Sequence, residues 1–206
     1  MWTKAFDSWT NRSARLHRGS CFCAFQGDRT AGLFDREIYL DIETLRLSHE
    51  VPGGWGNISG FGLAVAVTWD RENSFRRWFE PDAGKLVAEL EDFTQVVTFN
   101  GNRFDFEVLR AYAPVERLRK LSFDIHEVLY KQLGYRLKLD QLAKETLGSA
   151  KSGNGLQAVN WWRAGEKERV ALYCEQDVAI LRDLVEHGRA KGYVVVSSKQ
   201  VPVAWG

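Results

Sequence analysis

Two carboxylates placed two residues apart in an apolar segment are the residues of this sequence best suited to chemistry. They lie in Ile38-Tyr39-Leu40-Asp41-Ile42-Glu43-Thr44, which has the alternation of a strand. Alternate side chains of a strand share a face, so Asp41 and Glu43 point the same way. Charged side chains are rarely buried without compensation. Two interpretations are open here: the strand ends in solvent, or the two acids jointly bind a divalent cation.

A third carboxylate, Asp105, follows a short apolar segment and the turn Asn100-Gly101-Asn102. We expect Asp105 in the first turn of a helix, where the helix dipole favours an ionised carboxylate. An ordinary acid at a helix start has the same pattern, so Asp105 alone does not identify a site.

A tyrosine and an aspartate lie four residues apart in the longest predicted helix, as Tyr173-Cys174-Glu175-Gln176-Asp177. Residues at this spacing project from one helical face. The same face carries Leu181 and Leu184, which we expect to point into the core. An aspartate in line with apolar core residues needs a partner, and a metal ion would supply one.

The chemistry of these groups follows from their types. Mg²⁺ and Mn²⁺ prefer carboxylate oxygens as ligands. Four carboxylates can hold two such ions roughly 4 Å apart, one to activate a water molecule and one to stabilise the leaving oxygen in an in-line phosphoryl displacement. Tyr173, one helical turn from Asp177, is placed to orient that water or to help deprotonate it.

The three groups resemble the motifs of the DEDD superfamily of 3′–5′ exonucleases. Asp41-Ile42-Glu43 matches the D-x-E motif, Asn100 to Asp105 matches N-x-x-x-[FY]-D, and Tyr173 to Asp177 matches the tyrosine form of the third motif. The resemblance covers roughly residues 37–192. More narrowly, the chain looks like the stand-alone exonucleases related to the proofreading domain of family-B DNA polymerases. The segments that resemble this subgroup are Gly53-Gly54-Trp55, Phe61-Gly62-Leu63-Ala64-Val65-Ala66-Val67 and Lys151-Ser152-Gly153-Asn154-Gly155-Leu156.

The resemblance implies a site and a fold. Asp41, Glu43, Asp105 and Asp177 would bind two divalent cations, Mg²⁺ or Mn²⁺, and Tyr173 would position the nucleophilic water. Asn100 would support the substrate or the loop of the second motif. The implied fold is an α/β fold of the ribonuclease H-like type, with a five-stranded mixed sheet flanked by helices.

The implied activity is metal-dependent 3′–5′ exonuclease cleavage at the 3′ ends of single-stranded nucleic acid, with DNA slightly favoured over RNA. Two alternatives stay open. One is a nucleic-acid-binding module with the same fold and no turnover, although the presence of all four acids argues against it. The other is a nuclease specialised for short oligonucleotides.

Three further residues are predicted to contact substrate. Arg103, beside Asp105, is a candidate phosphate ligand. Lys151, in a Gly/Ser loop, either reaches a phosphate or is solvated, and Trp55, in a glycine-rich loop, either packs or stacks on a base. Trp161 and Trp162, just before the longest helix, likewise either pack that helix onto the sheet or stack on bases, at about 1–3 kcal/mol per base.

Other polar residues are interpreted structurally. Asp124 lies in an apolar-rich segment and is expected near the site. Asp140 is predicted to be the N-cap of a helix that Gly148 closes. His126 and His187 are interpreted as surface or hydrogen-bonded core histidines, because the sequence contains no H-x-x-x-H or His/Cys cluster.

The order of elements favours a sheet that starts as an antiparallel meander and adds parallel strands after a helical crossover. Strands are predicted over 37–43, 62–70, 74–80 and 95–99, and helices over 84–93, 104–113, 141–147 and 166–188. An apolar segment spans 121–130, and segments 193–196 and 200–205 are predicted to form a closing hairpin.

Length and composition bound the class of protein. The 206 residues suffice for one sizeable domain, predicted over 37–192, with an N-terminal extension of unclear role over 1–36 and a C-terminal hairpin or tail over 193–206. The net charge of +1 excludes a strongly basic nucleic-acid coat. Three cysteines provide no disulfide framework. The longest apolar run is strand-sized and no signal-peptide core is present, so we expect a cytoplasmic protein that does not enter a membrane.

Overall fold

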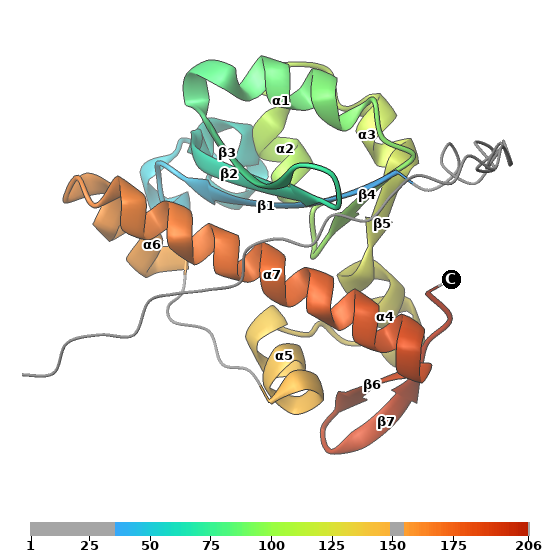
Figure 1. The fold of residues 1–206 in the computed structure, drawn as a ribbon. Helices are drawn as coiled ribbons and strands as arrows, with labels where there is room; N and C mark the ends of the chain where they lie inside the picture. The colour runs from blue at the N-terminus through green and yellow to red at the C-terminus, as the bar shows by residue number, and fades with distance from the viewer. Residues whose placement is uncertain (1–35, 149–154, 206) are drawn as a thin grey trace, which may run out of the picture.

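The computed structural model describes residues 36–148 and 155–205, which form an α/β arrangement (Figure 1). The strands are β1 (Glu37–Thr44), β2 (Leu63–Asp70), β3 (Ser74–Phe79), β4 (Gln95–Thr98), β5 (Ser122–Asp124), β6 (Tyr193–Val196) and β7 (Lys199–Pro202). The α-helices are α1 (Ala83–Leu90), α2 (Asp105–Leu109), α3 (Glu116–Leu121), α4 (Ile125–Leu133), α5 (Leu139–Leu147), α6 (Gly155–Arg163) and α7 (Lys167–Lys191). Short 3-10 turns at Ser48–Glu50, Gly54–Gly56 and Ile58–Phe61 connect β1 to β2, and another at Glu80–Asp82 precedes α1.

The main sheet has five strands in the order β3-β2-β1-β4-β5. β1 pairs antiparallel with β2 and β2 antiparallel with β3, whereas β1 with β4 and β4 with β5 are parallel. The predicted five-stranded mixed sheet is therefore confirmed. β1 is the central strand, so its side chains are covered on both faces and held by neighbours on both edges.

Helices cover both faces of the sheet (Figure 1). Ile38, Leu40 and Ile42 of β1 pack in one core with α1, α2 and α3. Tyr39 of β1 packs in the other core, which contains the apolar side of α7. Because side chains alternate along a strand, Asp41 and Glu43 lie on the face that α7 covers.

The longest helix, α7, has 25 residues and ends at Gly192, which takes the left-handed conformation. β6 and β7 follow as an antiparallel pair, as the predicted hairpin requires. This hairpin packs on α5 and α7 within the same core as the sheet. Within the described residues, no helix has both the length and the apolar character needed to cross a membrane.

Four local predictions are corrected. α5 begins at Leu139 with Lys138 as its N-cap, so Asp140 lies in the first turn instead of capping the helix. α2 ends at Leu109 instead of reaching residue 113, because Tyr112 is held outside the helix by hydrogen bonds with the Leu63 amide and Glu80. α3 and α6 form helices where none was predicted. Gly148 does close α5 in the left-handed conformation, as expected.

Several predictions concern residues outside the described ranges. Residues 1–35 of the extension predicted over 1–36 lie there, and so does Lys151. The predicted roles of these residues, and the division of the chain at residues 36 and 192, stay predictions.

Candidate active site

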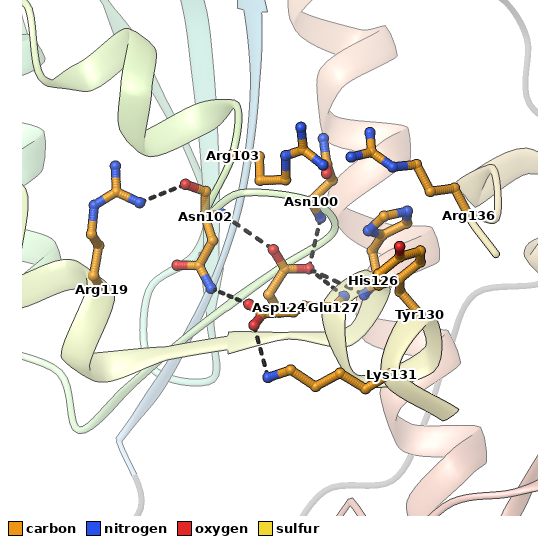
Figure 2. Close-up of a pocket in the computed structure, with 10 residues that line it drawn as sticks. All are labelled: Asn100, Asn102, Arg103, Arg119, Asp124, His126, Glu127, Tyr130, Lys131 and Arg136. Carbon is orange, nitrogen blue, oxygen red and sulfur yellow. Dashed lines mark hydrogen bonds and ion pairs between the residues drawn. The ribbon is translucent and has the colours of Figure 1, made fainter. Parts of the chain in front are cut away.

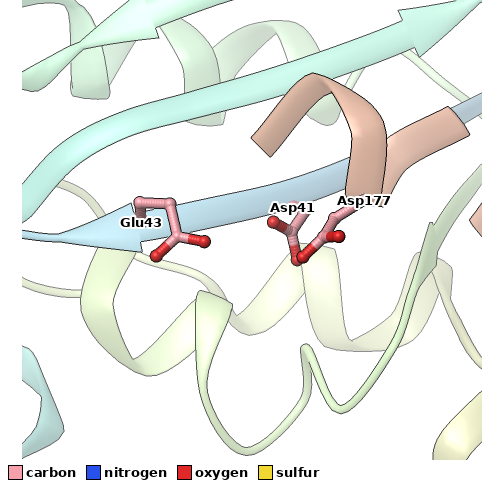
Figure 3. A group of neighbouring side chains, drawn as sticks. All are labelled: Asp41, Glu43 and Asp177. Atoms are coloured by element: carbon pink, nitrogen blue, oxygen red, sulfur yellow. The ribbon is translucent and has the colours of Figure 1, made fainter. Parts of the chain in front are cut away.

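Three of the four predicted carboxylates converge between the central strand and the longest helix. Asp41 and Glu43 come from β1 and Asp177 from α7, and one oxygen of each lies within 4.8 Å of the others (Figure 3). Glu43 and Asp177 are buried, whereas Asp41 is partly exposed. Since Mg²⁺ lies about 2.0–2.1 Å from its ligands, oxygens across an ion are about 4 Å apart. The three oxygens are therefore close to a spacing that a cation can bridge.

The backbone positions these acids with little freedom. Asp41 pairs with Val67 and Glu43 with Val65 of β2, and a register shift between Glu43 and Thr44 ends the regular pairing. α7 is fixed above them through Cys174, whose thiol donates to the Asp41 backbone carbonyl at 3.2 Å and to Asp41 Oδ2 at 3.4 Å. One side chain thus couples the helix to both the backbone and the carboxylate of β1.

Tyr173 lies beside the three acids, as the sequence predicted. Its side chain is buried and is hydrogen-bonded to Asp177. Burial, and then the negative charges of Asp177, Glu43 and Asp41, raise the pKa of the Tyr173 phenol far above its ordinary value. Tyr173 is therefore a neutral phenol that can donate a hydrogen bond, which favours an orienting role over that of a base.

The fourth predicted carboxylate, Asp105, is the first residue of α2 and is buried. Burial, and then the charges of Asp41 and Asp124, raise its pKa well above the ordinary value. The charge of Asp41 therefore acts on Asp105, but Asp105 stands outside the group of three oxygens. Its role as a metal ligand stays a prediction.

Asp124 lies near the site, as predicted, and has a structural role there. One carboxylate oxygen accepts hydrogen bonds from the Asn100 amide at 2.8 Å and the His126 amide at 3.1 Å, and the other accepts from the Asn102 amide at 3.2 Å. Asp124 thus caps α4 and fixes the loop before Asp105. Gly101 is required in this loop, because a Cβ there would lie 2.5 Å from Cβ of Thr98.

The predicted substrate-binding residues of the described chain lie in two separate places. Trp55 is 68% exposed, and its ring lies 5.4 Å from Phe61 and 6.2 Å from Phe104, the neighbour of Asp105. Arg103 and Asn100 line a separate pocket beside α4. Trp55 therefore packs against Phe61 and Phe104, while most of its surface stays accessible to solvent.

Trp161 and Trp162 lie on α6 and not in a connecting segment. Both are partly buried against the core. The Trp161 ring lies edge-on to Tyr173 with 5.9 Å between centroids, and the Trp162 ring lies 6.3 Å from Phe79. Packing therefore explains both tryptophans, and Trp161 packs on a residue of the site.

Both histidines make ring contacts. His126 is buried, packs edge-on against Phe99, and has its pKa lowered by burial. His187 lies edge-on to Tyr193. Neither histidine belongs to the carboxylate group. The expected hydrogen bond is not seen at His187, which is half-buried and whose Nε2 has no hydrogen-bond partner within the described residues.

Sequence reasoning gave Cys174 no role at the site and did not predict the contact of Trp161 with Tyr173. The signal for Cys174 was present, because it lies three residues before Asp177 and so shares its helical face. For Trp161 the sequence offered only an aromatic pair, because the helix that carries it was not predicted.

Comparison with known proteins extends this geometry. Residues 38–188 match the family model of the RNase H superfamily. The chain belongs to the RNase H superfamily. The match begins in β1 and ends in α7, so it spans Asp41, Glu43, Asp105, Tyr173 and Asp177. The predicted ribonuclease H-like fold is confirmed. No curated protein matches the sequence.

A solved structure supports the same fold. The family B DNA polymerase from the hyperthermophilic archaeon Pyrobaculum calidifontis matches with a TM-score of 0.56 and 14% sequence identity. The match covers 75% of this chain and 24% of the polymerase, so the chain spans about a quarter of that protein. At this identity the likeness shows the fold alone. Membership of the RNase H superfamily and the acidic group together support a nuclease.

Proposed function

We propose that this member of the RNase H superfamily is a 3′–5′ exonuclease that hydrolyses phosphodiester bonds at the 3′ end of single-stranded nucleic acid. The convergence of Asp41, Glu43 and Asp177 next to Tyr173 carries the proposal. The order of these residues in the chain is that of the tyrosine-type DEDD motifs. We propose DNA as the favoured substrate and the cytoplasm as the location.

The donor set fits divalent cations of the Mg²⁺ or Mn²⁺ class. All three clustered ligands are carboxylates, and no nitrogen or sulfur ligand belongs to the described group. Buried like charges at this spacing need positive charge to compensate them. Asp41, Glu43 and Asp177 would hold one ion, and Asp105, near Asp41, would complete a second position. The bound ions would supply an activated water and charge stabilisation for phosphoryl displacement.

The protein's own side chains have separable tasks in this proposal. Tyr173 stays protonated and hydrogen-bonded to Asp177, so its hydroxyl can orient a water or a phosphate oxygen. Cys174 holds the Asp41 carboxylate in one orientation. Trp55, supported by Phe61 and Phe104, offers an exposed ring face on which a base can stack.

Incubation with end-labelled single-stranded DNA and RNA tests the proposal. With Mn²⁺ or Mg²⁺, a 5′-labelled strand should shorten stepwise from its 3′ end, and EDTA should stop the reaction. Asp41→Asn should abolish product formation, whereas Asp92→Asn, a control on the exposed turn after α1, should cleave as the wild type does. A 3′-terminal phosphorothioate linkage should delay the first cleavage.

The alternatives give different results in the same assay. A binding module would retain the labelled strand without forming product in any metal. A nuclease for short oligonucleotides would degrade chains of a few nucleotides faster than long ones. Full activity of Asp41→Asn would remove the basis of the assignment.

A further inference from the structure

A pocket of about 540 Å³ lies beside the loop that precedes Asp105. Such a volume is within the usual range for small-molecule sites, roughly 300–1,000 Å³. The loop between β4 and α2 and helix α4 contribute most of its wall (Figure 2). The lining residues that matter here are Asn100, Arg103, Asp124, His126, Tyr130 and Arg136.

The pocket and the carboxylates share one structural element. Asn100 and Arg103 line the pocket, and the chain that carries them continues directly into Asp105. Asp124, in the pocket wall, and Asp41, in the acidic group, both act on the Asp105 carboxyl. If the 3′ end of a nucleic-acid strand is bound at Asp41, the nucleotides that precede it can therefore extend toward this pocket.

The acids of the pocket are already hydrogen-bonded within the protein. Asp124 accepts from the backbone amides of Asn100, Asn102, His126 and Glu127. The Glu127 carboxylate accepts from Asn102 Nδ2 at 2.8 Å and pairs with Lys131 at 2.8 Å. Both carboxylates thus have donors within the protein, and the basic side chains that line the pocket outnumber the acidic ones.

Two arginine side chains that line the pocket have no acidic partner within the described residues. Arg103 and Arg136 reach into it from opposite sides (Figure 2). Neither has an ion pair among residues 36–148 and 155–205, whereas Arg119, at the rim, is paired with Glu107. The pocket thus has two guanidinium groups available for phosphate oxygens, for which Arg is well suited.

Aromatic rings lie beside these cations. Tyr130 is 45% exposed, and its ring is nearly parallel to that of His126, with 10° between planes and 6.5 Å between centroids. Phe99 fixes His126 edge-on from 5.2 Å. A fixed histidine packed against an accessible tyrosine, near two arginines without an ion pair in the described part of the chain, combines the stacking surface and the positive charge that single-stranded nucleic acids require.

We propose that this pocket binds a nucleotide of the single-stranded substrate upstream of the scissile bond, with Tyr130 stacking on its base and Arg103 and Arg136 binding its phosphates. The inference rests on the proposed exonuclease function for the direction of the strand. The pocket would then make the enzyme favour chains of several nucleotides over mononucleotide esters.

Binding and turnover separate this proposal from the proposed function. Binding is measured by fluorescence anisotropy with a labelled oligothymidylate and Ca²⁺ in place of Mg²⁺. Tyr130→Ala and Arg136→Ala should each weaken binding about tenfold, and Tyr130→Phe should restore it. Arg136→Ala should also lower the salt dependence by about one phosphate contact, a slope change of roughly 0.7. Arg71→Ala, an exposed arginine at the β2–β3 turn, is the charge-matched control.

Hydrolysis of the p-nitrophenyl ester of thymidine 5′-monophosphate, with Mn²⁺, gives the second readout. The loss of kcat/KM caused by Tyr130→Ala or Arg136→Ala should be about tenfold larger on the oligonucleotide than on this ester. Equal losses on both substrates would overturn the proposal, as would unchanged oligonucleotide binding. Equal weakening of thymidine monophosphate binding would instead assign the pocket to the free mononucleotide and would also overturn it. If the wild type cleaves neither substrate yet binds the strand through Tyr130, the proposed function fails and the pocket stands.

Discussion

The thiol of Cys174 donates a hydrogen bond to Oδ2 of Asp41 across 133 residues of sequence. The same thiol also reaches the Asp41 backbone carbonyl. Cys174 is fully buried, and burial with the neighbouring acids raises its pKa well above the ordinary value, so it acts as a donor and not as a thiolate. Cys174 therefore orients one carboxylate of the acidic group.

Cys174→Ala should therefore reduce activity more than it reduces stability. Partners that orient metal ligands typically contribute about 10–100-fold to metal affinity or activity. We expect Cys174→Ala to raise the Mn²⁺ concentration needed for half-maximal cleavage by about tenfold, whereas Cys174→Ser, which keeps a donor, should stay near the wild type. Thermal unfolding of both variants supplies the control. Equal Mn²⁺ dependence in the two variants would show that the hydrogen bond has no positioning role.

Trp161 should position Tyr173 through the edge-on ring contact. A loosely held phenol would orient water less well, so we expect Trp161→Ala to lower kcat about tenfold with little change in KM. Trp161→Phe should recover most of the loss. Trp162→Ala is the matched control, because that ring contacts Phe79 instead of Tyr173. A similar kcat for both alanine variants would indicate that α6 acts only through general packing.

Asp105→Asn should stabilise the metal-free protein while abolishing turnover. The carboxyl is buried and close to Asp41, so removing its charge relieves repulsion that a bound cation would otherwise offset. We expect a gain on the order of 1 kcal/mol in the free energy of unfolding, measured with EDTA at neutral pH. Added Mn²⁺ should raise the melting temperature of the wild type more than that of Asp105→Asn. A destabilised, fully active variant would exclude Asp105 from the site.

Asp70 should make part of the stability depend on pH. Burial alone would raise the pKa of Asp70, but hydrogen bonds from Asn73, Glu72 and Arg76 lower it below the ordinary value. A lowered folded-state pKa gives stability that is present above the unfolded value of about 4 and is lost as pH falls through the folded value.

We therefore expect Asp70→Asn to cost about 1–2 kcal/mol at pH 7, with the difference from wild type shrinking below about pH 4. Urea unfolding at several pH values measures it, with Asp92→Asn as the surface control. A difference that stays constant down to strongly acidic pH would mean that the effect comes from turn geometry and not from charge.

The strand and helix patterns predicted much of the site because each acid is positioned by local periodicity. Asp41 and Glu43 share a face by the two-residue period of β1, and Tyr173 and Asp177 share a face by the helical period of α7. That these two faces meet is long-range information, and it came from the resemblance of the motifs and not from periodicity.

Local sequence patterns could not predict other features of the site, and the physical reason can be given for each. Asp140 was predicted as a cap because an aspartate is favourable both at the N-cap and in the first turn, and Lys138 took the capping position. The pairing of Cys174 with Asp41 depends on how α7 crosses the sheet. The availability of Arg103 and Arg136 depends on which partners the neighbouring acids already have, and Asp124 accepts hydrogen bonds from four backbone amides.

The division of the acidic group between β1 and α7 also affects when the enzyme can first act. Chains are synthesised from the N-terminus at about 5–20 residues per second, so Asp41 emerges on the order of ten seconds before Asp177. Until α7 docks on β1, a nascent chain carries Asp41 and Glu43 without the residue that closes the group. The acidic group is therefore complete only after α7 has been synthesised and has docked on the central strand.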